Sequence, residues 1–307
     1  MAKIEPQIVS YSELDTFRQC PLKHHLGYRM RWTRGVKPGS ALQKGSLWHQ
    51  VMETHYGLIK EWQDEDDDWY KMPESWQAEF LIRIYEDEIK PILWDATVGE
   101  WKSDVHELIN WMYEGYTQYW GLSMDWRIKG VEHQIITPLP DRRGRRSRYH
   151  LKAKMDLVIW DRSTEGLWVV DHKSGANLPT QMDLEIDDQF GLYTWAMRAV
   201  GRSVIGSLHS AARTQRNKSP MSLDSRFSHT YLNRGEVELD NLALDAYNAA
   251  RAAYPPKSME APQYSSPDPR SCGWKCDFKE PHLLMRTGQK QETVMTEYGF
   301  RIDRTRH

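Results

Sequence analysis

Two apolar stretches and the polar run between them constrain the fold of this chain more than any other feature. Residues 149–160 and 167–171 are rich in branched and aromatic side chains, and residues 161–166 (DRSTEG) are turn formers, so the sequence predicts a β-hairpin. In a hairpin that folds about the middle of this turn, Asp156 lies directly opposite Asp171. Directly opposed residues have Cβ atoms about 5 Å apart, so the two carboxylates repel each other unless something neutralises them.

Lys173 is the nearest residue that can neutralise this pair. It lies two residues beyond Asp171, so the period of a strand puts its ammonium on the same face. Two carboxylates with a nearby lysine make a hard-oxygen site suited to Mg²⁺ or Mn²⁺, in which the lysine can orient a water or a phosphate. The alternative is a solvated hairpin with a surface salt bridge. Against it, residues 167–170 (LWVV) are apolar without alternation, which indicates a strand buried on both faces, where terminal charges are costly.

Five sequence blocks occur in order along the chain: residues 12–21 (SELDTFRQCP), 45–49 (GSLWH), 155–158 (MDLV), 170–175 (VDHKSG) and 189–196 (QFGLYTWA). Together they resemble the PD-(D/E)XK nuclease superfamily and, within it, the RecB-like exonucleases that include a CRISPR-associated iron–sulfur adaptation nuclease. The similarity extends from about residue 10 to about residue 285. One departure is Met155, which stands where the name of the superfamily places proline.

The resemblance implies roles for individual residues around the hairpin. The implied metal ligands are the His49 side chain, the Asp156 and Asp171 carboxylates and the His172 carbonyl. Lys173 is expected to orient the attacking water and to stabilise charge on the phosphate. Gln189 and Tyr193 are one helical turn apart and share a face, from which they are expected to position the lysine or the scissile phosphate. Without the resemblance, a lone histidine on a helix is more often packed or exposed, and Tyr193 is a candidate for the core.

A second group of residues lies near the carboxyl end of the chain. In iron–sulfur relatives, one cysteine before the nuclease core joins three in a short final cluster; Cys20 matches the first, and Cys272 and Cys276 resemble the next two. Their separation by three residues departs from the usual two, and His282 stands in the place of the fourth cysteine. The resemblance implies a [4Fe–4S] cluster, with tetrahedral zinc as the alternative. Ordinary buried cysteines at a decayed site are the third interpretation.

Composition sets wider limits on function. The 307 residues are 39% hydrophobic with a net charge of −2, no apolar run can span a bilayer, and the amino terminus lacks the apolar core of a signal peptide, so we expect a cytoplasmic protein. Three cysteines are too few for a disulfide framework.

The basic stretches 142–148 and 213–218 are candidates for phosphate contacts beside the metal, or are solvated loops. The acidic run 64–68 repels phosphate and is interpreted as a solvated loop.

The order of the predicted elements indicates a helical region followed by a mixed α/β core. Predicted helices cover residues 12–28, 43–62, 73–92, 103–120, 183–200 and 236–254, and predicted strands cover residues 128–136, 149–160, 167–171, 203–212 and 225–232. The fold class is α/β, a restriction-endonuclease-like mixed sheet flanked by helices. The expected domains are a helical region at 1–125, the nuclease core at 126–254, and a proline-rich linker with the cysteine and histidine segment at 255–307.

The sequence therefore predicts a divalent-metal-dependent deoxyribonuclease. The expected activity is exonucleolytic hydrolysis at DNA ends in recombination, repair or replication, with single-stranded DNA or DNA with free ends as substrate and a recombination or replication protein as a possible partner. The first alternative is a DNA-end-binding or adaptation-complex subunit with little nuclease activity of its own. The intact set Asp156, Asp171 and Lys173 favours catalysis, because a pure binding module has no chemical need for it. A zinc-stabilised adaptor built on the final segment leaves the hairpin unexplained.

Overall fold

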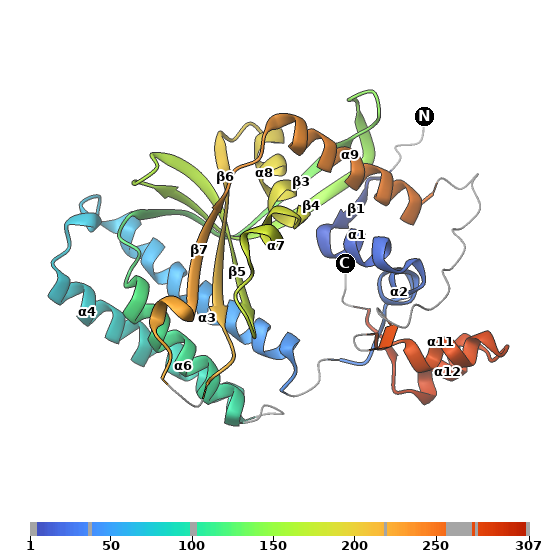
Figure 1. The fold of residues 1–307 in the computed structure, drawn as a ribbon, viewed down its shortest axis with the longest axis horizontal. Helices are drawn as coiled ribbons and strands as arrows, with labels where there is room; N and C mark the ends of the chain where they lie inside the picture. The colour runs from blue at the N-terminus through green and yellow to red at the C-terminus, as the bar shows by residue number, and fades with distance from the viewer. Residues whose placement is uncertain are drawn as a thin grey trace. The chain divides into compact units, whose positions relative to one another are not determined.

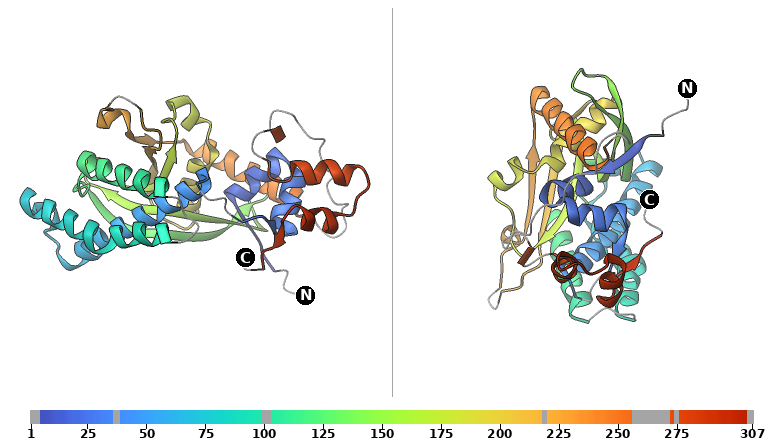
Figure 2. Two further views of the ribbon diagram at one scale, coloured as in Figure 1. Left: turned by 90° about the horizontal axis from the view of Figure 1, so that it is seen from below. Right: turned by 90° about the vertical axis from the view of Figure 1, so that its right-hand side faces the viewer.

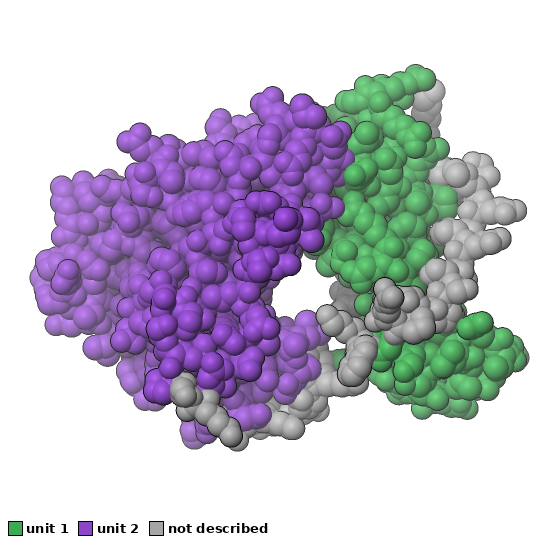
Figure 3. Space-filling view, in the orientation of Figure 1, with its two compact units in different colours: residues 1–35, 136–152, 243–307 green, residues 36–135, 153–242 purple. Residues whose placement is uncertain are grey.

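The computed structural model describes residues 5–35, 39–98, 103–217, 220–255, 272–273 and 276–304. The chain folds into two compact units (Figure 3). Unit 1 comprises residues 1–35, 136–152 and 243–307, and unit 2 comprises residues 36–135 and 153–242. The sequence predicted three consecutive segments instead, and their boundaries stay a prediction. Residues 256–271 of the predicted linker and Lys218 of the second basic stretch lie outside the described residues. Within the described ranges, no helix combines the length and the hydropathy needed to span a membrane.

A mixed sheet is the central element of the fold (Figure 1). Its strands are β1 (Gln7–Ser10), β3 (Trp126–Pro140), β4 (Arg146–Asp161), β5 (Gly166–Gly175), β6 (Val204–Arg213) and β7 (Phe227–Leu232). Their order is β1-β4-β5-β6-β7, and β3 also pairs with β4. The pairs β1–β4 and β5–β6 are parallel, whereas β4–β5 and β6–β7 are antiparallel. The predicted mixed sheet is confirmed.

The predicted hairpin is formed by β4 and β5 in the predicted register. Leu157 pairs with Val170 and Asp161 with Gly166, so the residues that flank these pairs, Asp156 and Asp171, face each other across the strands. The Asp161 carboxylate begins the turn by accepting the Ser163 N–H at 2.8 Å, a local bond that favours a turn over continued strand. The predicted end of the second strand at Asp171 was too early, because parallel pairing with β6 extends β5 to Gly175.

Helices cover both faces of the sheet in unit 2 (Figure 2). The helices of this unit are α3 (Ala41–Glu65), α4 (Glu74–Arg83), α5 (Lys90–Val98), α6 (Ser103–Trp120), α7 (Gln181–Glu185) and α8 (Asp188–Ala199), with short 3₁₀ turns at Trp69–Lys71 and Leu223–Ser225 and a π-helical turn at Ile84–Ile89. Alternate residues of β6 point to opposite faces of the sheet. Leu208 packs in the core with α3 and α6, whereas the Ser207 hydroxyl lies 2.6 Å from that of Thr194 on α8.

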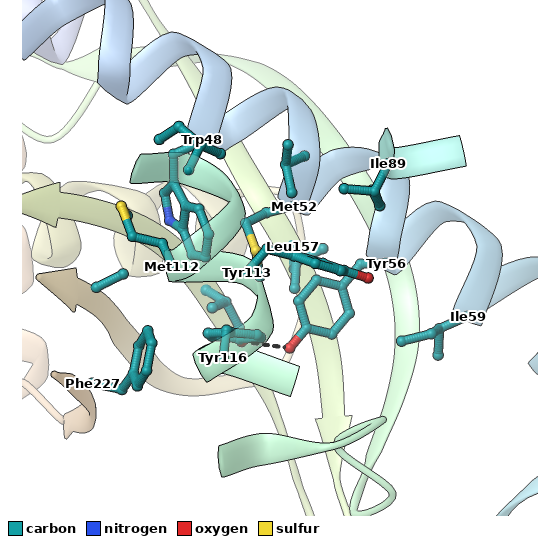
Figure 4. Packing of buried hydrophobic residues seen from close by; sticks show 14 of the residues in the cluster. Trp48, Met52, Tyr56, Ile59, Ile89, Met112, Tyr113, Tyr116, Leu157 and Phe227 are labelled. Carbon is teal, nitrogen blue, oxygen red and sulfur yellow. Dashed lines mark hydrogen bonds between the residues drawn. The ribbon is translucent and has the colours of Figure 1, made fainter. Parts of the chain in front are cut away.

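The core of unit 2 lies between the sheet and the helices α3 and α6 (Figure 4). From α3 it takes Trp48, Met52 and Tyr56, which are four residues apart and therefore share one face of the helix. The hydroxyls of Tyr56 and Tyr116 lie 2.7 Å apart in this apolar setting, so each satisfies the other's polar group. The long amphipathic helix predicted at residues 43–62 is thus fixed to the sheet along most of its length.

Unit 1 joins the two ends of the chain. Its elements are α1 (Tyr11–Gln19), α2 (Pro21–His24), a π-helical turn (His25–Arg29), β2 (Trp32–Thr33), the carboxyl-terminal part of α9 (Glu236–Ala253), α11 (Lys279–Arg286), α12 (Gln291–Glu297) and β8 (Arg301–Ile302). Leu22, Leu26 and Trp32 form a small core with side chains of the final segment, and β2 pairs with β8. The predicted helix 12–28 is broken at Cys20, because Pro21 has no N–H with which to continue α1. Cys20 has an extended backbone and is the N-cap of α2.

A buried polar network also fixes the first helices of unit 1. Glu13 on α1 is 8% exposed, and its carboxylate lies 3.0 Å from His24 Nε2 and accepts the Tyr254 hydroxyl. The Tyr149 hydroxyl donates to the Tyr254 carbonyl at 2.7 Å. A carboxylate this buried is tolerated only because its partners replace water, so the network makes the packing of α1 and α2 specific.

Candidate active site at the hairpin

The Asp156 carboxylate is held from two directions. The backbone N–H of His172 donates to Asp156 Oδ2 at 2.6 Å, a bond from one hairpin strand to the other. His49 comes from the third turn of α3, and its Nδ1 lies 3.2 Å from the same oxygen. The predicted partners His49 and Asp156 are therefore brought together by the contact between the long helix and the hairpin.

The Asp171 carboxylate is held by a different set of partners. Lys173 Nζ lies 2.6 Å from Asp171 Oδ2, which agrees with the prediction that the strand places both side chains on one face. Gln189 Nε2 on α8 donates to Asp171 Oδ1 at 3.0 Å and lies 2.9 Å from the Tyr193 hydroxyl. The predicted pair Gln189 and Tyr193 thus reaches the hairpin through Asp171, and α8 positions this carboxylate.

The two aspartates have opposite electrostatic character. Burial raises the pKa of Asp171 to about 6, because the Lys173 ammonium, which lowers this pKa, offsets only part of the effect of burial, and the Asp156 carboxylate raises the pKa as well. Burial also acts to raise the pKa of Asp156, but the His49 bond and the His172 backbone N–H outweigh it and lower that pKa. For Lys173, burial is outweighed by Asp171, which raises the pKa and keeps the ammonium charged. Two carboxylates with separated pKa values are typical of catalytic sites.

His172 contributes its backbone to this site. The side chain is 2% exposed and its ring is stacked on Tyr56 at 5.4 Å, within the core on the other face of β5. Burial lowers its pKa to about 4, so the imidazole is neutral at neutral pH. The side chain therefore packs against the aromatic core, and the predicted metal contact through the His172 carbonyl stays a prediction.

The donor set around the hairpin fits a divalent cation. In the described part of the chain, no three His, Cys, Asp or Glu side chains are gathered as a ready ligand group. Asp171 Oδ2 is buried, and the Lys173 ammonium lies 2.6 Å from it. A carboxylate oxygen with one such contact can accept a second partner. A carboxylate oxygen of this kind, together with Asp156 and an imidazole, matches the preferences of Mg²⁺ and Mn²⁺.

Two acidic residues beside the site were not predicted. Glu53 lies one helical turn after His49, and its pKa is raised by partial burial and by the nearby carboxylates of Glu132 and Asp156. Glu132 lies within β3 and has a positive φ of 51°, which is unusual for a residue with a side chain, and it forms an ion pair with Lys154. The spacing of four residues from His49 was the available indication for Glu53, whereas nothing local indicated the direction of Glu132.

The predicted cysteine and histidine group meets at one pocket in unit 1. The pocket has a volume of about 340 Å³, and its lining includes Cys20, Cys272, Cys276 and His282. None of the three cysteines forms a disulfide. Burial raises the pKa of Cys276, and the neighbouring sulfurs of Cys272 and Cys20 raise it further, so the three thiols lie close enough to interact. The structure brings together all four predicted residues from the two ends of the chain.

The basic stretches are partly occupied by local contacts. In the β3–β4 turn, the Arg145 guanidinium forms two hydrogen bonds with Asp141 at 2.8 and 2.9 Å. At the end of β6, Arg213 pairs in register with Gly175, two residues beyond Lys173, and donates to the Ala176 carbonyl at 2.9 Å. Arg216 donates to the Glu107 carbonyl. Among the described residues of the two basic stretches, Arg213 is therefore the one that the register places beside the end of β5, two residues beyond Lys173.

Comparison with known proteins identifies the family. A family model described as the PD-(D/E)XK nuclease superfamily matches residues 8–280. No curated protein matches the chain. Among solved structures, the crystal structure of SSO0001 is similar over 63% of this chain and 76% of that one, with 15% identity and a TM-score of 0.31, values too low to support an argument. The family match covers the hairpin, α3 and α8, and the chain belongs to the PD-(D/E)XK nuclease superfamily.

Proposed function

We propose that this protein is a metal-dependent DNA exonuclease of the RecB-like branch, acting on DNA ends. The superfamily indicates a nuclease that uses Mg²⁺ or Mn²⁺ and takes DNA as its substrate. The observation that carries the proposal is the group at the hairpin, where Asp156 and Asp171 face each other and Lys173 lies 2.6 Å from Asp171. His49 and Gln189 complete the branch-specific set, because each contacts one of the two aspartates.

Each residue of the group has a distinct task in this proposal. His49, Asp156 and Asp171 would hold the cation, which when bound polarises the phosphate and lowers the pKa of a bound water. Gln189 holds Asp171 Oδ1, which leaves Oδ2 beside Lys173, where it would serve as a ligand of the cation. The Lys173 ammonium, kept charged by Asp171, can orient the attacking water and stabilise negative charge on the phosphoryl oxygens. The half-exposed position of Lys173 lets its long side chain reach the substrate from β5.

We further propose that the pocket in unit 1 holds a [4Fe–4S] cluster. Cys20, Cys272, Cys276 and His282 supply ligands of the kinds that bind such clusters. A cluster is larger than a single ion, so its ligands can lie further apart than those of zinc, which suits a pocket of about 340 Å³ whose side chains do not form a single-ion group. By joining both chain ends, the cluster would stabilise unit 1.

The activity is tested with end-labelled linear DNA and with circular DNA, each single- and double-stranded, in Mg²⁺, Mn²⁺ or EDTA. We expect metal-dependent loss of the linear substrates, complete loss of activity in Lys173→Ala, and retained DNA binding in that variant. Degradation of circular DNA at the same rate would contradict the exonuclease assignment. DNA-end binding without cleavage by the wild type would identify the alternative, an adaptation-complex or end-binding subunit.

The cluster is tested on protein purified without oxygen. We expect a brown protein that contains iron and acid-labile sulfide, and Cys272→Ala should lose the colour and melt at a lower temperature. Colourless protein with stoichiometric zinc would select the tetrahedral site instead. Protein without any metal beyond the hairpin site would reject a shared centre.

A further inference from the structure

A groove in unit 2 is lined by residues that the proposed nuclease does not use. Its volume is about 780 Å³, and it lies between the carboxyl-terminal half of α3, residues 66–73, α4 and the π-helical turn Ile84–Ile89. The apolar lining includes Leu58 and Trp62 from α3 and Trp76 and Phe80 from α4. The Trp62 and Phe80 rings lie 5.3 Å apart, so they form a continuous aromatic surface.

One wall of this groove is α4, a helix whose apolar side chains are not fully buried by the rest of the unit. No residue of α4 is buried, although Trp76 and Phe80 are four residues apart and therefore share a face. Trp76 is 62% exposed. An exposed tryptophan beside other aromatic rings in a concave surface is typical of an interaction site, because tryptophan often supplies the largest share of binding energy at protein interfaces.

The rim of the groove is strongly acidic. Six carboxylates, Glu61, Glu65, Asp66, Asp68, Asp87 and Glu88, line it together with only two cations, Lys71 and Arg83. Lys71 lies 2.7 Å from one of these acids, and the Arg83 guanidinium lies over the Phe80 ring at 5.8 Å. The groove therefore presents an excess of four negative charges, the difference between six acids and two cations. DNA is repelled by such a surface, and a cationic ligand is attracted.

The acidic residues at the carboxyl-terminal end of α3 act against the stability of this helix. The last turn of α3 contains Asp64 and Glu65 and no basic residue, and Asp66 caps it. Carboxylates at the negative end of a helix dipole destabilise the helix, so these acids oppose the stability of α3. Asp64 is paired with Lys60, whereas Glu65 and Asp66 line the groove and contribute to its negative charge.

We propose that this groove binds a cationic segment of another protein, one that is rich in lysine or arginine and inserts an apolar side chain beside Trp76. The acidic rim would contact the cations of the segment, and the rings of Trp62, Trp76 and Phe80 would receive the apolar anchor. The inference goes beyond the proposed nuclease activity and does not depend on it.

The groove is separate from the hairpin site but connected to it by one helix. His49 and Trp62 are 13 residues apart on α3, which is about 20 Å along the helix axis. A segment bound at the groove would therefore leave the hairpin site open to DNA. Because the same helix carries a wall of the groove and the proposed metal ligand His49, the partner would be held at a fixed distance from the site of cleavage.

The test uses the full chain and two labelled amphipathic peptides of leucine and tryptophan, one with lysine and one with glutamate at the polar positions. Fluorescence anisotropy should show binding of the lysine peptide and not of the glutamate peptide. Trp76→Ala and the double variant Glu65→Lys/Asp66→Lys should each weaken binding by about tenfold or more. Glu292→Lys/Glu297→Lys on α12 makes the same change in net charge at residues that do not line the groove, and it should leave binding unchanged.

Several outcomes would overturn the proposal. If the control variant loses as much affinity as Glu65→Lys/Asp66→Lys, net charge, and not the groove, attracts the peptide. Binding of both peptides with the same affinity would remove the acidic rim from recognition. If light scattering shows a dimer that Trp76→Ala converts to a monomer, the groove is an interface between copies of this chain. Should Trp76→Ala fail to fold by circular dichroism, the double charge variant decides alone.

Discussion

The opposite character of the two aspartates gives a prediction about stability without metal. Asp171 is 3% exposed, and its pKa of about 6 lies above the ordinary value of 3.8. A carboxyl group with a raised folded-state pKa contributes stability that is fully present below the unfolded pKa and is lost as the pH rises through about 6. The difference corresponds to about 3 kcal/mol. Ionised Asp171 therefore destabilises the metal-free protein at neutral pH.

Asp171→Asn removes this charge and keeps the shape of the side chain. The amide oxygen can still accept from Gln189, so the variant in EDTA at about pH 8 should be more stable than the wild type by up to about 3 kcal/mol. For a unit of the size of unit 2, that gain is an increase in melting temperature of up to about 8 °C. The loss of the Lys173 partner reduces the gain, but Lys173 is 38% exposed and can turn to solvent. The difference should shrink as the pH falls below about 6 and disappear below the ordinary carboxyl pKa of 3.8.

Asp156→Asn is the matched control, because the sign of its effect is opposite. The pKa of Asp156 is lowered, so its charge contributes stability above the ordinary carboxyl pKa, and this stability is lost as the pH falls through the folded-state value. The variant should melt below the wild type in EDTA at about pH 8, since the amide weakens the contacts with His49 and the His172 N–H. Thermal unfolding followed by circular dichroism measures both variants. A lower melting temperature for Asp171→Asn than for the wild type would refute the reasoning.

Three further predictions concern other parts of the molecule. Gln189→Leu should lower the cleavage rate of end-labelled DNA by about tenfold or more, because it removes a positioning bond, whereas Tyr193→Phe should have a smaller effect, since the amide keeps its contact with the aspartate. Glu13→Ala should destabilise unit 1 by about 3 kcal/mol in thermal unfolding, because it leaves two buried partners unsatisfied. If the β3–β4 turn contacts DNA, Arg142→Ala should reduce the salt dependence of binding by about one unit of slope, and Arg145→Ala by less, because a neighbouring aspartate already holds that guanidinium.

The hairpin was predictable because its determinants are local. The turn formers at 161–166 fix the centre of the hairpin, and the period of two then places Asp156, Asp171 and Lys173 on one face without knowledge of any other element. The helix at 43–62 was predictable for the same reason, because its apolar face recurs at helical spacing. Both predictions use only distances along the chain that a single element defines.

Other features depend on contacts between distant segments. Strand β1 has four residues, Gln7–Ser10, and exists because it pairs in parallel with the beginning of β4, a contact that no local pattern indicates. The division into two units likewise follows from packing between the two chain ends. The role of Gln189 was predicted only through family resemblance, because the spacing of α8 does not reveal that its amide would reach Asp171.

The arrangement of exposed and buried groups explains how one site can be stable without metal and still accept a cation. Asp171 has a side chain 5% exposed and is fixed by Gln189 on α8, while Asp156 is fixed by the His172 backbone. Their basic partners His49 and Lys173 have side chains 36% and 38% exposed, so they can move toward solvent without disturbing the core. The acidic groups are therefore the rigid part of the site and the basic groups the adjustable part. A cation that replaced the Lys173 contact would relieve the repulsion between the two carboxylates, and metal binding would then be coupled to the stability of the hairpin.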